Sequence, residues 1–153
     1  MNNKVHYLSP EGLKKLEEEL HELKTVRQRE TADKIEAAKA LGDLSENAEY
    51  QEAKQEMSFI HGRRQEIETI LKNVEIIKEG GSDIIEIGSS IDTEIKGENK
   101  KFKIVGSEEA DPFEGLISNE SPLGSAFLGH GKGDEIEVET PGGVQVYKIL
   151  SVS

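Results

Sequence analysis

The sequence contains no cysteine and no tryptophan, and aromatic residues make up only 5% of its 153 residues. Without cysteine, both a disulfide framework and a thiolate metal site are excluded. No apolar run approaches the roughly 20 residues that a membrane-spanning helix needs, and the first residues do not resemble a signal peptide. We therefore expect a soluble, cytoplasmic protein that binds no membrane.

Apolar residues are also few relative to charged ones, at 34% and 33% of the chain. This composition provides too little apolar surface for one large core and suits an elongated molecule with a modest second core. The net charge of −12 is uneven, because residues 1–78 carry −3 and residues 79–153 carry −9. An acidic surface repels phosphates, which argues against tight independent binding to nucleic acid. The acidic second half is expected to contact protein.

The two halves of the chain also differ in their local pattern. Glycine and proline are rare up to residue 78 and frequent after it, where β-branched residues alternate with polar ones. This change predicts a domain boundary between residues 1–78 and residues 79–153. The first domain is predicted to be a long antiparallel coiled-coil hairpin, and the second a small, mostly antiparallel β-sheet with one helix. The predicted fold class is α+β.

The predicted hairpin contains two helices with coiled-coil spacing. The first begins near Ser9, which can cap it, and its seam comprises Leu13, Leu16, Leu20, Leu23, Ala32, Ile35, Ala38 and Leu41. The second is predicted over residues 45–78, with Ala53, Ile60, Ile67, Ile70, Val74 and Ile77 in its seam. Both helices are most polar near their shared turn. At about 1.5 Å per residue, they form an arm of about 45 Å whose far end can lie in water.

Four strands are predicted in the second half, at residues 89–95, 101–105, 134–140 and 144–152. Gly142 and Gly143 lie between the last two and are typical of a tight hairpin turn. A short helix is predicted to start after Ser121, with Pro122 in its first turn, and to end at Gly129.

The turn between the long helices, residues 41–50, places Asp43 and Glu46 three residues apart. One interpretation is a capping box, in which these side chains satisfy free backbone N–H groups. The other is a site for a hard cation such as Mg²⁺, which commonly takes one or two protein carboxylates and completes its shell with water and phosphate. Two carboxylates cannot form a closed site. The isolated chain is therefore expected to bind no ion, and any Mg²⁺ would be shared with a partner.

The segment GDLSENAEY, residues 42–50, closely resembles the tip of the Gre transcript cleavage factors, and the GreA type more than GreB. The resemblance extends along the second helix to residues 53–54, 59–60 and 62–63, and to the N-terminal residues 8–13 and 16–20. It recurs in the second half at residues 104–106, 117–118, 121–124, 133–134 and 140–143. It therefore covers nearly the whole chain in the same order.

This resemblance implies an FKBP-like second domain that docks on RNA polymerase outside the secondary channel, and a coiled coil that enters the channel. There Asp43 and Glu46 would help to bind the second catalytic Mg²⁺, held jointly with the polymerase, and to activate the water that cleaves backtracked RNA. Asn47, Glu49 and Tyr50 would position the tip. The expected partners are RNA polymerase and the 3′ end of the nascent RNA. We expect a monomer that stimulates the polymerase and is not itself an enzyme.

Basic residues near the tip are candidates for contacts with RNA phosphates: Lys39, Lys54, Arg63 and Arg64. The alternative is that they keep the arm solvated and pair with neighbouring glutamates. The patch is sparse, which again resembles the GreA type and predicts a preference for short backtracked RNAs.

Three other functions are weighed against this one. An inhibitor of the same fold would occupy the channel without promoting cleavage, but such proteins carry additional acidic residues at the tip. A peptidyl-prolyl isomerase or chaperone would need an aromatic-lined pocket, and the second half offers only Phe102, Phe113, Phe127 and Tyr147. A coiled-coil adaptor would keep its seam apolar to the end.

Overall fold

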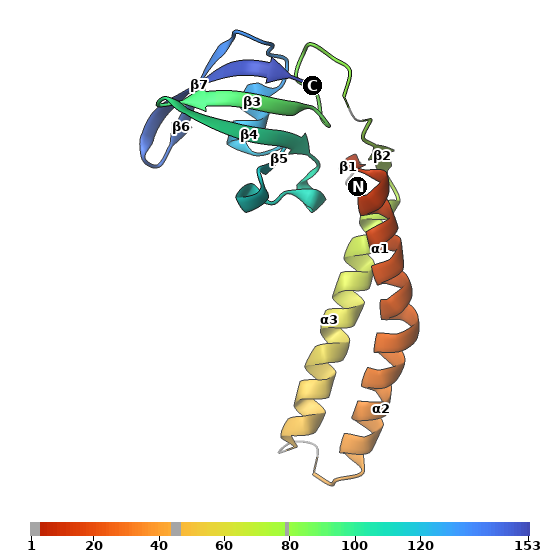
Figure 1. Ribbon diagram of the computed structural model, residues 1–153. Helices are drawn as coiled ribbons and strands as arrows, with labels where there is room; N and C mark the ends of the chain where they lie inside the picture. Colours follow the sequence, from red (N-terminus) through yellow and green to blue (C-terminus); the bar gives the residue numbers. More distant parts are fainter. Residues whose placement is uncertain (1–3, 44–46, 79) are drawn as a thin grey trace. The chain divides into compact units, whose positions relative to one another are not determined.

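The computed structural model describes residues 4–43, 47–78 and 80–153. The chain divides into two compact units. The hairpin unit comprises Leu13–Asn73, and the sheet unit comprises the N-terminal segment up to Gly12 together with Val74–Ser153. The fold is α+β, with an N-terminal helical hairpin and a C-terminal curled sheet (Figure 1). These units differ from the predicted division into residues 1–78 and 79–153, because the N-terminal segment and residues 74–78 belong to the sheet unit.

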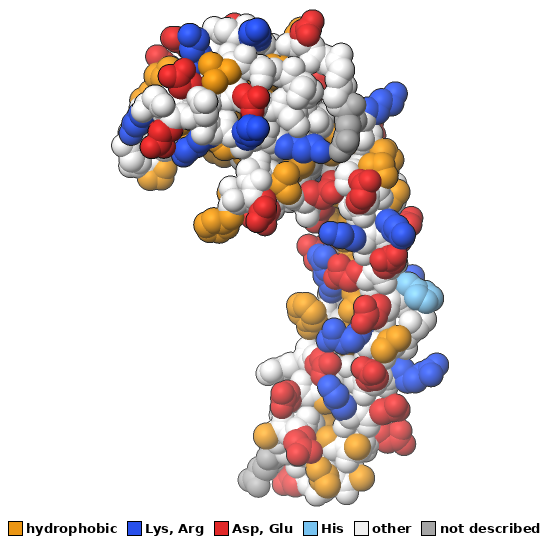
Figure 2. Space-filling view, viewed as in Figure 1, with side chains coloured by type: hydrophobic (Ala, Val, Ile, Leu, Met, Phe, Trp, Pro, Cys, Tyr) orange, Lys and Arg blue, Asp and Glu red, His pale blue; other side chains and the backbone are white. Residues whose placement is uncertain are grey.

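The hairpin consists of two antiparallel arms (Figure 1). The first arm contains α1 (Pro10–Glu22), a π-helical turn η1 (Leu23–Arg27) and α2 (Gln28–Lys39), and the second arm is α3 (Ala48–Leu71). The predicted seam of the second helix is confirmed at its buried positions, which are Ala53, Ile60, Ile67 and Ile70. Charged side chains of both signs alternate over the exposed hairpin surface (Figure 2).

The π-helical turn changes the register of the first arm. The N–H of Gln28 bonds to the carbonyl of Leu23, the five-residue spacing that defines such a turn. From Leu16 on, the buried positions of the first arm are consequently seven residues apart except across this turn, where eight residues separate Leu23 from Thr31. The prediction that Ala32 lies in the seam is therefore wrong: Ala32 is exposed, and Thr31 is fully buried.

The second arm ends earlier than predicted. α3 stops at Leu71, and Val74–Ile76 form strand β2, which pairs in parallel with β1 (His6–Leu8). The N–H of Ile77 extends this pairing with a 2.8 Å hydrogen bond to the carbonyl of Leu8. The prediction of helix through residue 78 is wrong because β-branched Val74 and Ile76 meet a partner strand far away in the sequence. The predicted start at residue 45 lies outside the described residues, and α3 is described from Ala48.

The second sheet has five strands in the order β5-β4-β3-β7-β6. The strands are β3 (Ser90–Ile95), β4 (Glu98–Val105), β5 (Leu116–Ser118), β6 (Glu135–Thr140) and β7 (Gly143–Val152). All neighbouring strands are antiparallel except β4 and β5. The four predicted strands are confirmed, with ends that differ by at most three residues, and the short β5 is the strand that the pattern did not reveal.

The core of the sheet unit is closed by α4 (Pro122–Phe127), whose start is capped as predicted. The hydroxyl of Ser121 accepts a 3.0 Å hydrogen bond from the N–H of Gly124. Phe127 is fully buried, and its ring centroid lies 5.8 Å from that of Phe102 and 5.6 Å from that of Tyr147. Burial raises the pKa of the Tyr147 phenol. Three of the four aromatic side chains of this half thus pack on one another, which leaves little for an isomerase pocket.

The start of α1 is anchored to η2 (Ser107–Glu109) within the sheet unit. The backbone N–H of Ser9 donates to Oε2 of Glu109 at 2.7 Å, and the Ser9 hydroxyl donates to Oε1 at 2.5 Å. The same hydroxyl accepts from the N–H of Gly12 at 3.0 Å, which confirms the predicted cap. A carboxylate next to a helix N-terminus is also favoured by the helix dipole.

Candidate functional site at the tip of the hairpin

The end of α2 begins the tip. The N–H of Leu41 donates to the carbonyl of Ala38 at 3.1 Å, so the last helical turn tightens before the chain leaves the helix. Gly42 follows with a φ of +119°, a backbone conformation that side chains other than glycine rarely adopt. The tip sequence therefore ends the first arm sharply, immediately before Asp43.

The start of α3 is held by Asn47. Its Oδ1 atom accepts a 3.1 Å hydrogen bond from the N–H of Tyr50, which makes Asn47 the N-cap of this helix. Its Nδ2 atom donates a 2.7 Å hydrogen bond to the carbonyl of Ala38 in the other arm. One half-buried side chain therefore links the end of α2 to the first turn of α3.

These contacts bear on the two candidate carboxylates. Asp43 is exposed and precedes the N-cap by four positions, so it is not the N-cap of α3, which is Asn47. Glu46, the other candidate, lies outside the described residues.

The first turns of α3 carry the other predicted tip residues. Glu49 is exposed in the first turn, where the helix dipole favours a carboxylate. Tyr50 is half-buried, and the Nζ atom of Lys54 lies 5.2 Å from the centroid of its ring. That distance allows a cation–π contact that holds the tyrosine ring and the lysine together on one face of α3. Lys39, in the last turn of α2, is exposed.

The two arginines have partners within the hairpin. Arg63 donates to Glu19 through Nε at 2.7 Å and through Nη2 at 3.0 Å, and its Nη1 donates to Glu66 at 2.9 Å. The hydrogen bond from Arg63 holds the pKa of the Glu19 carboxyl below its usual value. Arg64 donates to Oε1 of Gln28 at 2.5 Å. Arg63 therefore pairs with glutamates, as the alternative has it, whereas Arg64 contacts a glutamine, and both side chains connect the two arms.

A second polar cluster spans the arms closer to the tip. Lys34 donates to Glu56 at 3.1 Å, and Nη2 of Arg27 lies 3.5 Å from the same carboxylate. The hydrogen bond from Lys34 is the main cause of a lowered pKa at Glu56. Sequence reasoning did not identify these partners, since pairing across the arms depends on the register that η1 shifts.

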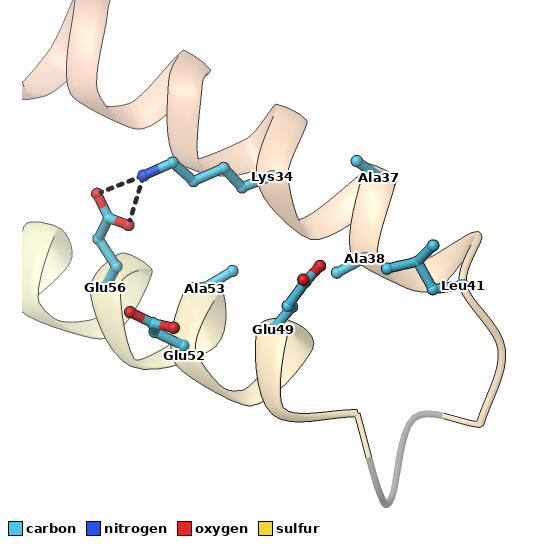
Figure 3. A pocket seen from close by; sticks show the side chains of 8 residues that line it. All are labelled: Lys34, Ala37, Ala38, Leu41, Glu49, Glu52, Ala53 and Glu56. Atoms are coloured by element: carbon cyan, nitrogen blue, oxygen red, sulfur yellow. Dashed lines mark hydrogen bonds and ion pairs between the residues drawn. The ribbon is translucent and has the colours of Figure 1, made fainter.

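A groove of about 450 Å³ lies between α2 and α3 beside this cluster (Figure 3). Alanine and leucine side chains form its apolar part, and the Lys34–Glu56 ion pair lies at one end (Figure 3). Its lining residues are Lys34, Ala37, Ala38, Leu41, Glu49, Glu52, Ala53 and Glu56. Sequence reasoning did not detect this groove, which results from small residues facing each other across the arms.

Two further properties concern the described part of the chain. Within residues 4–43, 47–78 and 80–153, no group of three or more histidine, aspartate or glutamate side chains is arranged to hold a metal ion. No helix in these ranges is long and apolar enough to cross a membrane.

Both halves of the chain match sequence models of known domains. Residues 6–76 match the model described as transcription elongation factor, N-terminal. Residues 80–153 match the model described as transcription elongation factor, GreA/GreB, C-terminal. The two matches together cover almost the whole chain and adjoin each other near Gly80.

The chain is also similar to curated proteins named transcription elongation factor GreA. It is 50% identical over 149 residues to the protein of Thermoanaerobacter pseudethanolicus, with 95% of each chain covered. It is 47% identical over 154 residues to the protein of Bacillus licheniformis, with 98% of each covered. Among solved structures, GreA factor homolog 1 of Thermus thermophilus matches at 27% identity and a TM-score of 0.45, with 98% of this chain and 99% of that chain covered.

Proposed function

The chain belongs to the GreA/GreB family of transcription elongation factors, and we propose that it rescues backtracked RNA polymerase by stimulating cleavage of the RNA 3′ end. Family membership identifies it as a factor that acts on the polymerase and not as an enzyme in its own right. The single observation that carries the proposed mechanism is the tip, where an exposed Asp43 lies between a sharp helix end and a separately capped helix start.

The arm is proposed to enter the secondary channel of the polymerase. From Pro10 to Lys39 the first arm is helical throughout, which at about 1.5 Å per residue gives a reach of about 45 Å. Its surface is mostly charged and polar, with a few exposed apolar side chains, which suits a segment surrounded by water and by a polar channel wall (Figure 2). A long polar arm contributes little to its own core, so its length is best explained by reach.

Asp43 and Glu46 are the proposed donated carboxylates. Carboxylate oxygens are hard ligands of the kind that Mg²⁺ prefers, and a pair suits an ion whose remaining ligands come from the polymerase, water and phosphate. When bound, the ion would stabilise the attacking and leaving oxygens during phosphodiester hydrolysis. The chain's own part would be to place both carboxylates and to orient the water.

The remaining tip residues are proposed to keep these carboxylates in place. Asn47 supports this role most directly, because it connects both arms across the turn. Tyr50 and Lys54 support it through their contact on α3, and Glu49 through its place in the first turn of that helix. Lys39 and Lys54 are exposed and are the proposed contacts for the RNA 3′ segment. Arg63 and Arg64 are weaker candidates, since both have partners in the hairpin.

The sheet unit is proposed to have the FKBP-like fold and to dock on the rim of the secondary channel. Its half of the chain is the more acidic one, which favours contact with protein over nucleic acid. The factor would act as a monomer and in the cytoplasm, where the polymerase transcribes.

The experiment that tests this function is cleavage in purified, backtracked elongation complexes with Mg²⁺. Addition of the wild-type chain is expected to release short 3′ RNA fragments faster than the polymerase does alone. Binding to the polymerase without faster cleavage, or with slower cleavage, would favour the channel-binding inhibitor instead.

A further inference from the structure

The groove between α2 and α3 has a floor of small apolar side chains. Ala38 and Ala53 are 3% and 4% exposed and lie at the bottom of this space of about 450 Å³, and Ala37 is exposed at its edge. Leu41 forms the edge nearest the turn and is 69% exposed. Ala37 and Leu41 provide the apolar surface of the groove that water covers when the chain is alone.

The rim of the groove is acidic. Glu56 is neutralised by Lys34, but Glu49 and Glu52 have no ion-pair partner among the residues that the structure describes. Figure 3 shows the Glu49 carboxylate directed across the groove toward Ala38, with Glu52 one turn further along α3. The groove therefore combines an apolar floor with two carboxylates that have no partner there.

We propose that this groove receives a basic side chain of RNA polymerase, an arginine or a lysine, when the arm is inserted. The inference rests on the proposed function, since it names a contact that the inserted arm makes. Arginine and lysine have aliphatic stems that pack on apolar surface and charged heads that carboxylates bind. The stem would lie on the exposed Ala37 and Leu41, and the head between Glu49 and Glu52.

Other occupants fit less well. A purely apolar side chain would bury two carboxylates without compensation, which is costly. An RNA phosphate would be repelled by the same carboxylates. A metal ion would need further ligands, and the described residues provide no group of three for it. The groove adjoins the turn. A polymerase side chain bound in it would therefore fix how deeply the tip is inserted into the polymerase.

The test is equilibrium binding of the full chain to core RNA polymerase at low and at high salt. The variant Glu49→Gln/Glu52→Gln is expected to bind about tenfold more weakly at low salt and to lose part of the salt dependence, because a paired charge is removed from a contact shielded from water. The matched control, Asp33→Asn/Glu36→Gln, removes the same charge from exposed positions of α2 that do not line the groove. It is expected to change binding less than twofold.

Equal binding by the two double variants would overturn the proposal, and so would weaker binding with an unchanged salt dependence. The contact is also mapped directly, because a chain without cysteine accepts a single photoreactive label at Ala37→Cys. Crosslinks to an arginine- or lysine-containing segment of the polymerase are expected, and crosslinks to RNA alone would contradict the assignment. Transcript cleavage stimulated by the wild-type chain is measured in parallel. If the wild type does not stimulate cleavage, the proposed function is rejected. If it does, and the groove variants bind the polymerase as the wild type does, only the proposed role of the groove is rejected.

Discussion

The side-chain amide of Asn47 donates a 2.7 Å hydrogen bond to the backbone carbonyl of Ala38, across the turn that joins the two arms. The oxygen of the same amide caps α3 through the N–H of Tyr50. The two ends of the turn are therefore tied by one side chain. Asp43 lies between these ends, and we expect the brace to limit how far its carboxylate can move.

Replacement of Asn47 by alanine is expected to lower the free energy of unfolding by about 1–2 kcal/mol, since it removes a helix cap and a hydrogen bond between the arms. It should also slow stimulated transcript cleavage more than it weakens binding to the polymerase. Asn47→Ser is the matched control, because a serine hydroxyl caps the helix but does not reach Ala38. Urea unfolding measures the change in stability, and the rate of stimulated cleavage measures the change in function. If both the serine and the alanine variant have the stability and the cleavage rate of the wild type, Asn47 does not brace the turn.

The structure assigns the cap of α3 to Asn47, a residue that the capping-box interpretation did not include. Asp43 and Glu46 have the spacing of a capping box, and Asn47 is an equally good capping residue. Which of these residues caps α3 depends on where the first arm ends and the turn begins. The residue pattern of the second helix does not show where the first arm ends. The tip as a whole was recognisable from residues 42–50, whereas the contact between Asn47 and Ala38 required the fold.

Two glycines are expected to respond oppositely to alanine. Gly62 lies within α3, and an added Cβ would meet nothing within 4 Å. Gly62→Ala should therefore raise the free energy of unfolding by about 0.5–1 kcal/mol, the usual cost of glycine inside a helix. At Gly124 an added Cβ would lie 1.9 Å from the carbonyl oxygen of Ser118.

Because that neighbour is backbone, α4 would have to move, and Gly124→Ala is expected to destabilise the sheet unit by about 1–3 kcal/mol or more. Thermal unfolding of the two variants against the wild type measures both changes. A gain of stability at Gly124, or a loss at Gly62, would contradict the packing described for the two helices.

The ion pair between Glu19 and Arg63 predicts a pH dependence. The pKa of Glu19 is lowered in the folded chain, so its stabilisation is fully present above the unfolded value of 4.5 and is lost as pH falls through the folded value. The Glu19 side chain is 40% exposed, which limits the contribution at neutral pH to at most about 1 kcal/mol. Glu19→Gln should remove it.

Urea unfolding at about pH 7 and at about pH 3 checks this prediction. The wild type should exceed Glu19→Gln in stability at the higher pH, and the two should converge at the lower one. Glu17→Gln, which changes an exposed neighbour on the same helix, is the control and should follow the wild type. A constant difference between wild type and Glu19→Gln at both pH values would contradict the ion-pair origin.

The parts that sequence could not predict share one physical cause, which is dependence on distant partners. Val74 and Ile77 continue the helical spacing of Ile67 and Ile70, yet Val74–Ile76 form a strand because β1 offers a parallel edge. Thr31 replaces Ala32 in the seam because η1 inserts a residue into the first arm. Local signals such as the Ser9 and Ser121 caps, by contrast, were read correctly, since each cap bonds within one turn of its own helix.

The central claim is that the tip donates carboxylates to the polymerase, and the most direct measurement compares wild type with Asp43→Asn/Glu46→Gln. These changes preserve side-chain size and remove both charges. The assay uses backtracked complexes with Mg²⁺ and a saturating concentration of the factor. The variant is expected to stimulate cleavage at least about a hundredfold less than the wild type, as is usual for a lost general base or charge-stabilising group. Its affinity for the polymerase is expected to stay within about threefold of the wild-type value. Cleavage by the variant at the wild-type rate, with equal occupancy of the polymerase, would contradict the account.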